Sequence, residues 1–265
     1  MRKTVLGGAI LLWVLMVSGC GLGVGNGKSV GNSPADQQVA QAEALVQEGQ
    51  WAEAAKLYKD VLDQYPDHRD IEKTRQASYD LNMRILFSNA VTLETVQHEV
   101  VPGDTLGKIS KRYNVTMDLI RASNNLKGDV IRVGQKLRIW TGKFTVLVDK
   151  SRNTLMLKNN GEVWKVYSVS TGTGNSTPVG TFKIVTRLEN PVWFRTGAVI
   201  PPESPENVLG TRWMGFDIEG YGIHGTVEPD KIGQQVTAGC VRMRNSDVEE
   251  LYAILPMGTE VTIVD

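Results

Sequence analysis

The sequence predicts a multidomain α+β fold, in which a helical hairpin precedes a small strand–helix–helix–strand (βααβ) module and a mainly-β C-terminal domain. Three observations predict it. Apolar residues recur at helical spacing from Val39 to Leu62, two short helical patterns lie between strand patterns in residues 97–141, and alternating strand patterns follow from residue 143. At 265 residues the chain is long enough for two or three domains.

The composition excludes some classes of function. Lys plus Arg total 29 and Asp plus Glu total 29, so the formal net charge is zero and no global basic field favours nucleic acid. The hydrophobic content of 41% is that of a globular protein. With two cysteines and three histidines, a His/Cys zinc cluster is hard to assemble. We therefore expect no metal, no cofactor and no nucleic-acid partner.

The N-terminus has the pattern of an export signal. Arg2 and Lys3 precede an apolar run from Thr4 to Val17, which at about 1.5 Å per residue covers about 21 Å, less than the roughly 30 Å core of a bilayer. Together with Val17-Ser-Gly-Cys20, this segment resembles a bacterial lipoprotein signal. The resemblance implies a signal peptide at 1–19, lipid on Cys20, and anchoring in the cell envelope or periplasm, at the outer membrane if the organism is diderm.

An uncleaved anchor and a plain signal peptide are the alternatives to a lipoprotein signal. Residues 20–34 are rich in glycine and predict a flexible, lipidated linker.

Residues 35–96 predict a helical hairpin whose two helices are separated at Gly49. The spacing of Trp51, Ala54, Tyr58, Leu62 and Pro66 resembles one tetratricopeptide repeat, and Leu81–Phe87 predicts a further packing helix. Because such repeats depend on stacked neighbours for their core, a spacer or docking hairpin is favoured over peptide recognition.

Residues 97–141 predict strands at His98–Val101 and Lys136–Trp140, with helices at Thr105–Tyr113 and Thr116–Ser123 between them. Asp104 or Thr105 is the expected cap of the first helix. The run from Val101 to Leu106 and the later Gly134-Gln135-x-Leu137-x-Ile139 resemble a LysM domain. The resemblance implies peptidoglycan glycan binding at Gly103, Asp104, Thr105 and Leu106. The alternative is a βααβ unit that serves only as a spacer.

Residues 143–265 predict a strand-rich domain. Strand patterns cover Phe144–Asp149, Thr154–Lys158, Val163–Val169 and Thr181–Val185, and Asn159-Asn160-Gly161 is a strong hairpin turn signal. A helix follows for which Ser246 is the expected N-cap with Glu249 three residues later. It is expected to end at Pro256, before a last strand from Gly258 to Val264.

Cys240 is the candidate nucleophile of this domain. It follows Gly239 shortly before the predicted helix, where backbone N–H groups and the cations Arg242 and Arg244 favour a lowered thiol pKa. His224 is the single histidine in the domain. From these residues alone, a buried thiol and a structural imidazole remain the favoured alternative.

Three segments together, Thr177–Phe182, Tyr221–Thr226 and Thr237–Met243, resemble the YkuD family of L,D-transpeptidases over about Lys143 to Asp265. The resemblance implies a β-sandwich-like catalytic domain with Cys240 as nucleophile and His224 as general acid and base. It also implies that the backbone carbonyl of Gly225 orients His224 and that the N–H groups of Gly239 and Cys240 bind the oxyanion.

Three further residues are candidates for contact with the substrate. Arg242 matches a family arginine that fixes substrate or a loop, and a structural salt bridge is the equal alternative. Tyr221 and Trp193 are candidates for substrate binding, although such aromatics more often pack in cores. Ala238 stands where many family members have a second histidine. Four carboxylates around His224 are expected to form a solvated rim: Asp217, Glu219, Glu228 and Asp230.

The resemblance predicts a peptidoglycan L,D-transpeptidase that binds stem peptides and glycan strands and is held at a membrane by its lipid anchor. The enzyme is expected to release terminal D-Ala from a tetrapeptide stem and to transfer the acyl group to an amine, in cross-linking or in protein attachment. An L,D-carboxypeptidase that transfers to water and a non-catalytic wall-binding lipoprotein are the alternatives. The sequence leaves the acceptor open.

Overall fold

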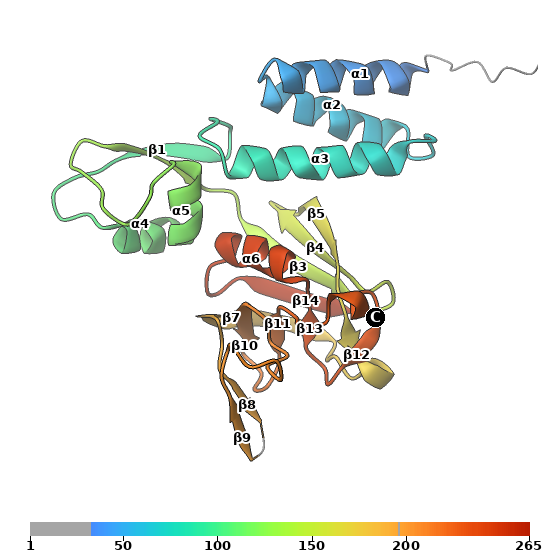
Figure 1. The fold of residues 1–265 in the computed structure, drawn as a ribbon. Helices are drawn as coiled ribbons and strands as arrows, with labels where there is room; N and C mark the ends of the chain where they lie inside the picture. Colours follow the sequence, from blue (N-terminus) through green and yellow to red (C-terminus); the bar gives the residue numbers. More distant parts are fainter. Residues whose placement is uncertain (1–32, 196) are drawn as a thin grey trace, which may run out of the picture.

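The computed structural model describes residues 33–195 and 197–265, which fold as three helices, a βααβ module and a sheet domain in chain order (Figure 1). The predicted signal peptide at 1–19, the lipidation of Cys20 and nearly all of the 20–34 linker lie outside the described residues. Within those residues, no helix has the length and apolar character needed to cross a membrane.

The N-terminal helices form a layer at one end of the molecule (Figure 1). They are α1 (Pro34–Gln47), α2 (Trp51–Gln64) and α3 (Ile71–Leu86). Ser33 and Asp36 form a capping box at the start of α1, and Gly49 adopts φ +79 where the chain reverses. α1 and α2 pack against each other, and the further helix expected at Leu81–Phe87 is present but already begins at Ile71. The first half of α3 buries the small polar residues Thr74 and Ser78, which give no apolar pattern.

The βααβ module has the predicted order of elements: β1 (Thr95–Glu99), α4 (Leu106–Tyr113), α5 (Met117–Ser123) and β2 (Lys136–Trp140). β1 and β2 pair antiparallel. The hydroxyl of Thr105 accepts from the Lys108 N–H and caps α4, and Thr116 caps α5 in the same way. Of the two expected caps of α4, Thr105 is therefore the one used.

Within the described residues, the C-terminal domain is built on one mixed eight-stranded sheet with the order β13-β11-β10-β7-β14-β3-β4-β5. Its strands have the bounds β3 (Phe144–Asp149), β4 (Thr154–Asn159), β5 (Glu162–Ser168), β7 (Gly180–Glu189), β10 (Arg212–Phe216), β11 (Gly222–His224), β13 (Val241–Arg242) and β14 (Glu260–Val264).

The long strand β7 pairs with β14 over its first half and with β10 over its second half, so it joins the two parts of the sheet. Asn160 and Gly161 have φ values of 49 and 87, which confirms the predicted turn between β4 and β5.

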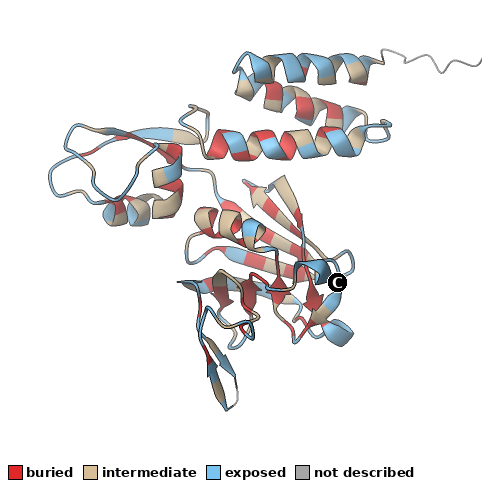
Figure 2. Ribbon diagram, in the orientation of Figure 1, coloured by how far each residue is buried: buried red, intermediate tan, exposed pale blue. Residues whose placement is uncertain are grey.

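The helix α6 (Asn245–Ile254) covers the sheet and buries Val248, Leu251 and Ile254 against it. Figure 2 shows the buried residues concentrated on the strands and on the inner side of this helix. Arg244 is the N-cap residue and makes no side-chain capping bond. The prediction that Ser246 caps this helix was therefore wrong, because Ser246 already lies inside the helix and its hydroxyl contacts Asp247.

Two smaller pairs complete the domain. β6 (Thr171–Gly172) pairs parallel with β12 (Gln235–Thr237), while β8 (Trp193–Arg195) and β9 (Ala198–Ile200) form a hairpin that projects from the sheet (Figure 1). The base of the hairpin is tied by Asn207. Its buried amide group donates to the carbonyls of Pro191, Ile200 and Pro201, and its oxygen accepts from the Leu209 N–H.

Polar contacts join the three parts of the chain. The buried guanidinium of Arg138 on β2 donates to the carbonyls of Leu86 and Ile85 at the end of α3, at 3.0 and 3.2 Å. Burial lowers the pKa of Arg138 to about 10. The Thr116 hydroxyl at the start of α5 donates to the carbonyl of Ala253 in α6. The βααβ module therefore contacts both of its neighbours through buried donors.

Candidate active site

Cys240 lies directly before β13, at the end of the sheet where β11 is the neighbouring strand. It is half-buried, and its thiol donates to the carbonyl of Gly220 at 3.4 Å. The preceding Gly239 has φ +136, which strongly favours glycine, and a Cβ there would lie 2.7 Å from the Tyr221 ring. Gly239 is therefore required by both the backbone conformation and the close approach of Tyr221.

His224 ends β11 and is buried. Its Nδ1 lies 2.7 Å from the carbonyl oxygen of Gly225. Because a carbonyl only accepts, the proton of the neutral ring is on Nδ1, and Nε2 carries the free lone pair. The indole of Trp213 stacks on the ring, with centroids 5.9 Å apart. The hydrogen bond to Gly225 therefore favours the Nδ1–H tautomer of the neutral ring.

The register of β11 and β13 brings the cysteine and the histidine together. The two strands are parallel, with Ile223 beside Val241 and His224 beside Arg242. Cys240 directly precedes Val241, so it lies next to Gly222, two residues before His224 on the neighbouring strand. The two candidate catalytic groups therefore lie at one end of the sheet. In this structure the thiol itself is hydrogen-bonded to Gly220 rather than to the imidazole.

Burial controls the protonation of both groups. It lowers the pKa of His224 from 6.5 to about 4, although the hydrogen bond to Gly225 favours the protonated ring. Burial also raises the pKa of the Cys240 thiol, outweighing a backbone hydrogen bond from Gly222 and the charge of Arg242. The prediction of a lowered thiol pKa was therefore wrong. The resting site holds a neutral thiol and a neutral imidazole.

Arg242 is used within the protein. Its buried guanidinium donates to a carboxylate oxygen of Glu228 at 3.1 Å, and Glu228 also pairs with Lys231. Glu228 keeps 39% of its side chain exposed, as expected for a solvated rim, and it also carries the charge that compensates the buried arginine. Through its main chain Arg242 also exchanges two hydrogen bonds of 2.8 Å with Ser170. Arg242 therefore fixes the strand after Cys240, and its ion pair with Glu228 is the structural salt bridge that the sequence analysis gave as one of its two roles.

The two candidate oxyanion donors differ in their surroundings. The Gly239 N–H donates to the hydroxyl of Thr237 at 3.1 Å, and that hydroxyl donates to the Cys240 carbonyl at 2.7 Å. For the Cys240 N–H, no acceptor is found among residues 33–195 and 197–265. Of the two N–H groups, that of Cys240 is the one available to a ligand in this structure.

The two predicted substrate-binding aromatics lie in different places. Tyr221 packs against Gly239 beside the cysteine. Trp193 lies in the projecting hairpin, where the Arg195 guanidinium is 5.4 Å from its ring. Trp213, which the sequence offers as a cleft or core aromatic, lies directly across from His224 in the strand register. The pairing of β10 with β11 identifies this position, and no local sequence pattern shows that pairing.

The predicted glycan-binding loop of the βααβ module is largely held by its own contacts. Asp104 accepts from the Val101 N–H and lies 3.0 Å from His98 Nε2, and the Val101 hydrogen bond lowers the pKa of its carboxyl. Thr105 caps α4, and Leu106 is buried. Gly103 is exposed, with φ +89. Binding by the Asp104 and Leu106 side chains stays a prediction, and the loop offers mainly its backbone.

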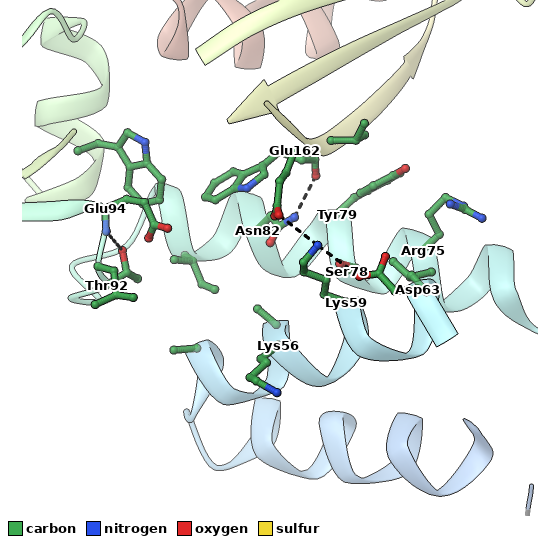
Figure 3. A pocket seen from close by; sticks show the side chains of 18 of the residues that line it. Lys56, Lys59, Asp63, Arg75, Ser78, Tyr79, Asn82, Thr92, Glu94 and Glu162 are labelled. Atoms are coloured by element: carbon green, nitrogen blue, oxygen red, sulfur yellow. Dashed lines mark hydrogen bonds and ion pairs between the residues drawn. The ribbon is translucent and has the colours of Figure 1, made fainter. Parts of the chain in front are cut away.

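A separate groove of about 1050 Å³ lies between α2, α3 and β5, away from Cys240 (Figure 3). Lys59 reaches across it to Glu162 at 3.2 Å and also pairs with Asp63. Asn82 donates to the Trp164 carbonyl at 3.1 Å. These contacts connect the helices to the edge strand of the sheet. In the part of the chain that the structure describes, no cluster of three or more potential metal ligands occurs.

Sequence comparisons agree with this division of the chain. The profile of the L,D-transpeptidase catalytic domain (YkuD) matches residues 143–263, and that of the LysM domain matches residues 98–140. Two relatives from Bacillus subtilis strain 168 carry provisional names as the L,D-transpeptidases YqjB and YkuD. YqjB is 42% identical over 126 residues, covering 45% of this chain and 70% of that protein. YkuD is 34% identical over 174 residues, covering 63% of this chain and 97% of that protein.

Solved structures are similar over about half of the chain. The crystal structure of an L,D-transpeptidase from Mycobacterium tuberculosis H37Rv aligns with a TM-score of 0.41 and 17% identity. The alignment covers 50% of this chain and 63% of that chain.

Proposed function

The chain belongs to the YkuD family of L,D-transpeptidases, and from this premise we propose that Cys240 and His224 carry out its acyl transfer. The observation that carries the proposal is the parallel register of β11 and β13, in which His224 stands beside Arg242, two residues from Cys240. The His224 tautomer supports it further, because the Gly225 carbonyl engages Nδ1 and leaves Nε2 as the base.

In the proposed reaction, Nε2 of His224 takes the thiol proton as sulfur attacks the carbonyl of the third residue in a tetrapeptide stem. The Cys240 N–H stabilises the oxyanion of the tetrahedral intermediate. The C–N bond to the terminal D-alanine then breaks, and the imidazolium returns its proton to the leaving amine. The acyl group is now a thioester on Cys240. An acceptor amine attacks it, loses a proton to His224, and the thiolate leaves and is reprotonated.

The neutral resting pair determines when the proton moves. An imidazole with a pKa of about 4 does not deprotonate a thiol whose pKa is raised, so the free enzyme stores no thiolate. Proton transfer is therefore coupled to attack on the bound carbonyl. Hydrolysis by water, the carboxypeptidase reaction, is the competing outcome.

The LysM and L,D-transpeptidase domains together imply that the chain binds peptidoglycan and works at the cell wall or envelope. We extend this to glycan strands held by residues 97–141, stem peptides processed by residues 143–265, and a lipid anchor on Cys20 after removal of residues 1–19. The N-terminal pattern of Arg2 to Cys20 supports the anchor. Holding the glycan raises the local concentration of stems without changing the chemistry.

Purified protein incubated with tetrapeptide muropeptides tests the reaction by liquid chromatography with mass spectrometry. We expect D-alanine release with formation of cross-linked dimers, and loss of both products in Cys240→Ser and His224→Asn. The matched control is Cys20→Ser, which removes the other of the two cysteines and should retain full activity in vitro. Release of D-alanine with tripeptides alone would assign the carboxypeptidase reaction instead. Unchanged activity of Cys240→Ser would overturn the proposed nucleophile.

A further inference from the structure

Asn245, the first residue of α6, holds two other segments of the domain together. Its side-chain oxygen accepts from the Thr226 N–H at 3.0 Å and from the Thr211 N–H at 3.3 Å. Because both partners are backbone donors, the oxygen of the amide must face them. Asparagine often caps the helix that it starts, but this oxygen is directed away from α6. The side chain therefore serves the segments that follow β11 and precede β10.

The Thr226 N–H belongs to the same peptide unit as the Gly225 carbonyl. A trans peptide is planar, and its N–H and C=O point in opposite directions. One end of this plane is held by Asn245 at 3.0 Å, and the other end accepts from Nδ1 of His224 at 2.7 Å. Rotating the plane to weaken one hydrogen bond also weakens the other. The direction of the carbonyl that orients the imidazole is therefore set by Asn245.

The backbone around the Asn245 amide leaves no room for a side chain at two neighbouring glycine positions. A Cβ at Gly225 would lie 2.2 Å from Asn245 Oδ1, and a Cβ at Gly210 would lie 2.3 Å from the same atom. Gly210 also has φ +64, in the left-handed region that favours glycine. Two glycines thus let the Asn245 oxygen approach both chains closely. No side chain at either position is compatible with the observed hydrogen bonds.

We propose that Asn245 is a positioning residue for the acyl transfer, which fixes the Gly225–Thr226 peptide so that His224 keeps its Nδ1–H tautomer and its orientation toward Cys240. This inference rests on the proposed function, in which His224 is the base. Asn245 touches neither substrate nor sulfur in this role. The second hydrogen bond that Asn245 accepts, from the Thr211 N–H, links the Gly225–Thr226 peptide to the segment that leads from the β8–β9 hairpin into β10.

The test compares Asn245→Ala, Asn245→Asp and the control Ser246→Ala, which changes the exposed neighbouring residue. General acid–base catalysis contributes about 100- to 10,000-fold, so losing the orientation of the base should lower kcat of Asn245→Ala by about 10- to 100-fold with little change in KM. Asn245→Asp keeps an acceptor of the same shape and should recover most of kcat. Its new negative charge should raise the apparent pKa of the base in the pH–rate profile. Ser246→Ala should match the wild type.

Nitrogen-15 NMR of the His224 ring provides a second readout that does not depend on turnover. We expect a single Nδ1–H tautomer in the wild type and in Asn245→Asp, and a mixture of tautomers in Asn245→Ala. A folded Asn245→Ala protein with wild-type kcat and an unchanged tautomer would overturn the proposal. An equal loss of kcat in the Ala and Asp variants with the tautomer intact would also overturn it.

If the wild-type protein shows no acyl transfer, the proposed function fails, and the tautomer measurement still tests the positioning role. If Asn245→Ala does not fold, Asn245→Ser replaces it, because the serine hydroxyl is too short to reach both N–H groups. The comparison is then interpreted in the same way. A lower kcat and mixed tautomers in Asn245→Ser but not in Asn245→Asp support the proposal, and wild-type kcat with an unchanged tautomer in Asn245→Ser overturns it.

Discussion

Acid should destabilise the folded protein through His224. The buried ring takes up its proton with a pKa of about 4, whereas an exposed histidine in the unfolded chain does so near 6.5. Between these pH values the unfolded state binds more protons, so the free energy of unfolding falls as the pH falls. The contribution of His224 is complete above pH 6.5 and is lost progressively down to about pH 4.

The two pKa values determine the size of the effect. Integrating the difference in bound protons from pH 7.5 to pH 4.5 gives a loss of about 2.5 kcal/mol of unfolding free energy from this one ring. A typical domain has about 5–15 kcal/mol in total, so the loss is readily measured. It arises because a charged imidazole is poorly solvated in its buried position beside Trp213.

Urea unfolding followed by tryptophan fluorescence at several pH values measures this loss. We compare the wild type with His224→Asn, which keeps a polar side chain but does not titrate. The other histidines, His68 and His98, are present in both proteins and cancel in the comparison. The wild type should lose about 2.5 kcal/mol more than the variant between pH 7.5 and 4.5. Equal losses in the two proteins would refute the assignment of a buried, neutral imidazole.

Three further substitutions test contacts between and within the domains. Arg138→Ala removes the donors to the Leu86 and Ile85 carbonyls, so we expect the free energy of unfolding to fall by about 2–3 kcal/mol. Urea denaturation measures this loss, and an unchanged midpoint would contradict the stabilising role of Arg138. Asn207→Ala leaves the buried carbonyls at the base of the β8–β9 hairpin without their donor, so amide hydrogen exchange in that hairpin should become faster. Similar exchange rates in the variant and the wild type would contradict the role of Asn207 in holding the hairpin. Thr116→Val removes the cap of α5 and the hydrogen bond to Ala253, so we expect the free energy of unfolding to fall by about 1–2 kcal/mol and the Tm to decrease. A Tm equal to that of the wild type would contradict the contribution of Thr116.

Local patterns were sufficient to predict many elements of the fold. The bounds of the strands Lys136–Trp140 and Phe144–Asp149 agree with the sequence prediction, because each has a strict alternation or a dense apolar run between clear turn residues. The Asn160-Gly161 turn also follows from local chemistry. The start of α3 was missed because its buried positions are small and polar.

The candidate site was only partly predictable, since its chemistry depends on pairings between distant segments. The resemblance indicated Cys240 and His224, but the pairing of Arg242 with Glu228 requires the loop after β11 to fold back over β13. The sign of the thiol pKa change was also missed. Sequence reasoning counted nearby cations, whereas the structure shows that Arg242 is already paired and that burial dominates. Asn245 was overlooked because its partners are backbone groups, which no residue pattern reveals.

The protonated state of Cys240 has a consequence for the oxidation of its sulfur. Peroxides oxidise the thiolate far faster than the thiol, and the first product is a sulfenic acid. Since burial raises the pKa of this thiol, the resting sulfur is oxidised more slowly than that of an exposed cysteine. The burial that delays formation of the thiolate therefore also slows its oxidation by peroxide.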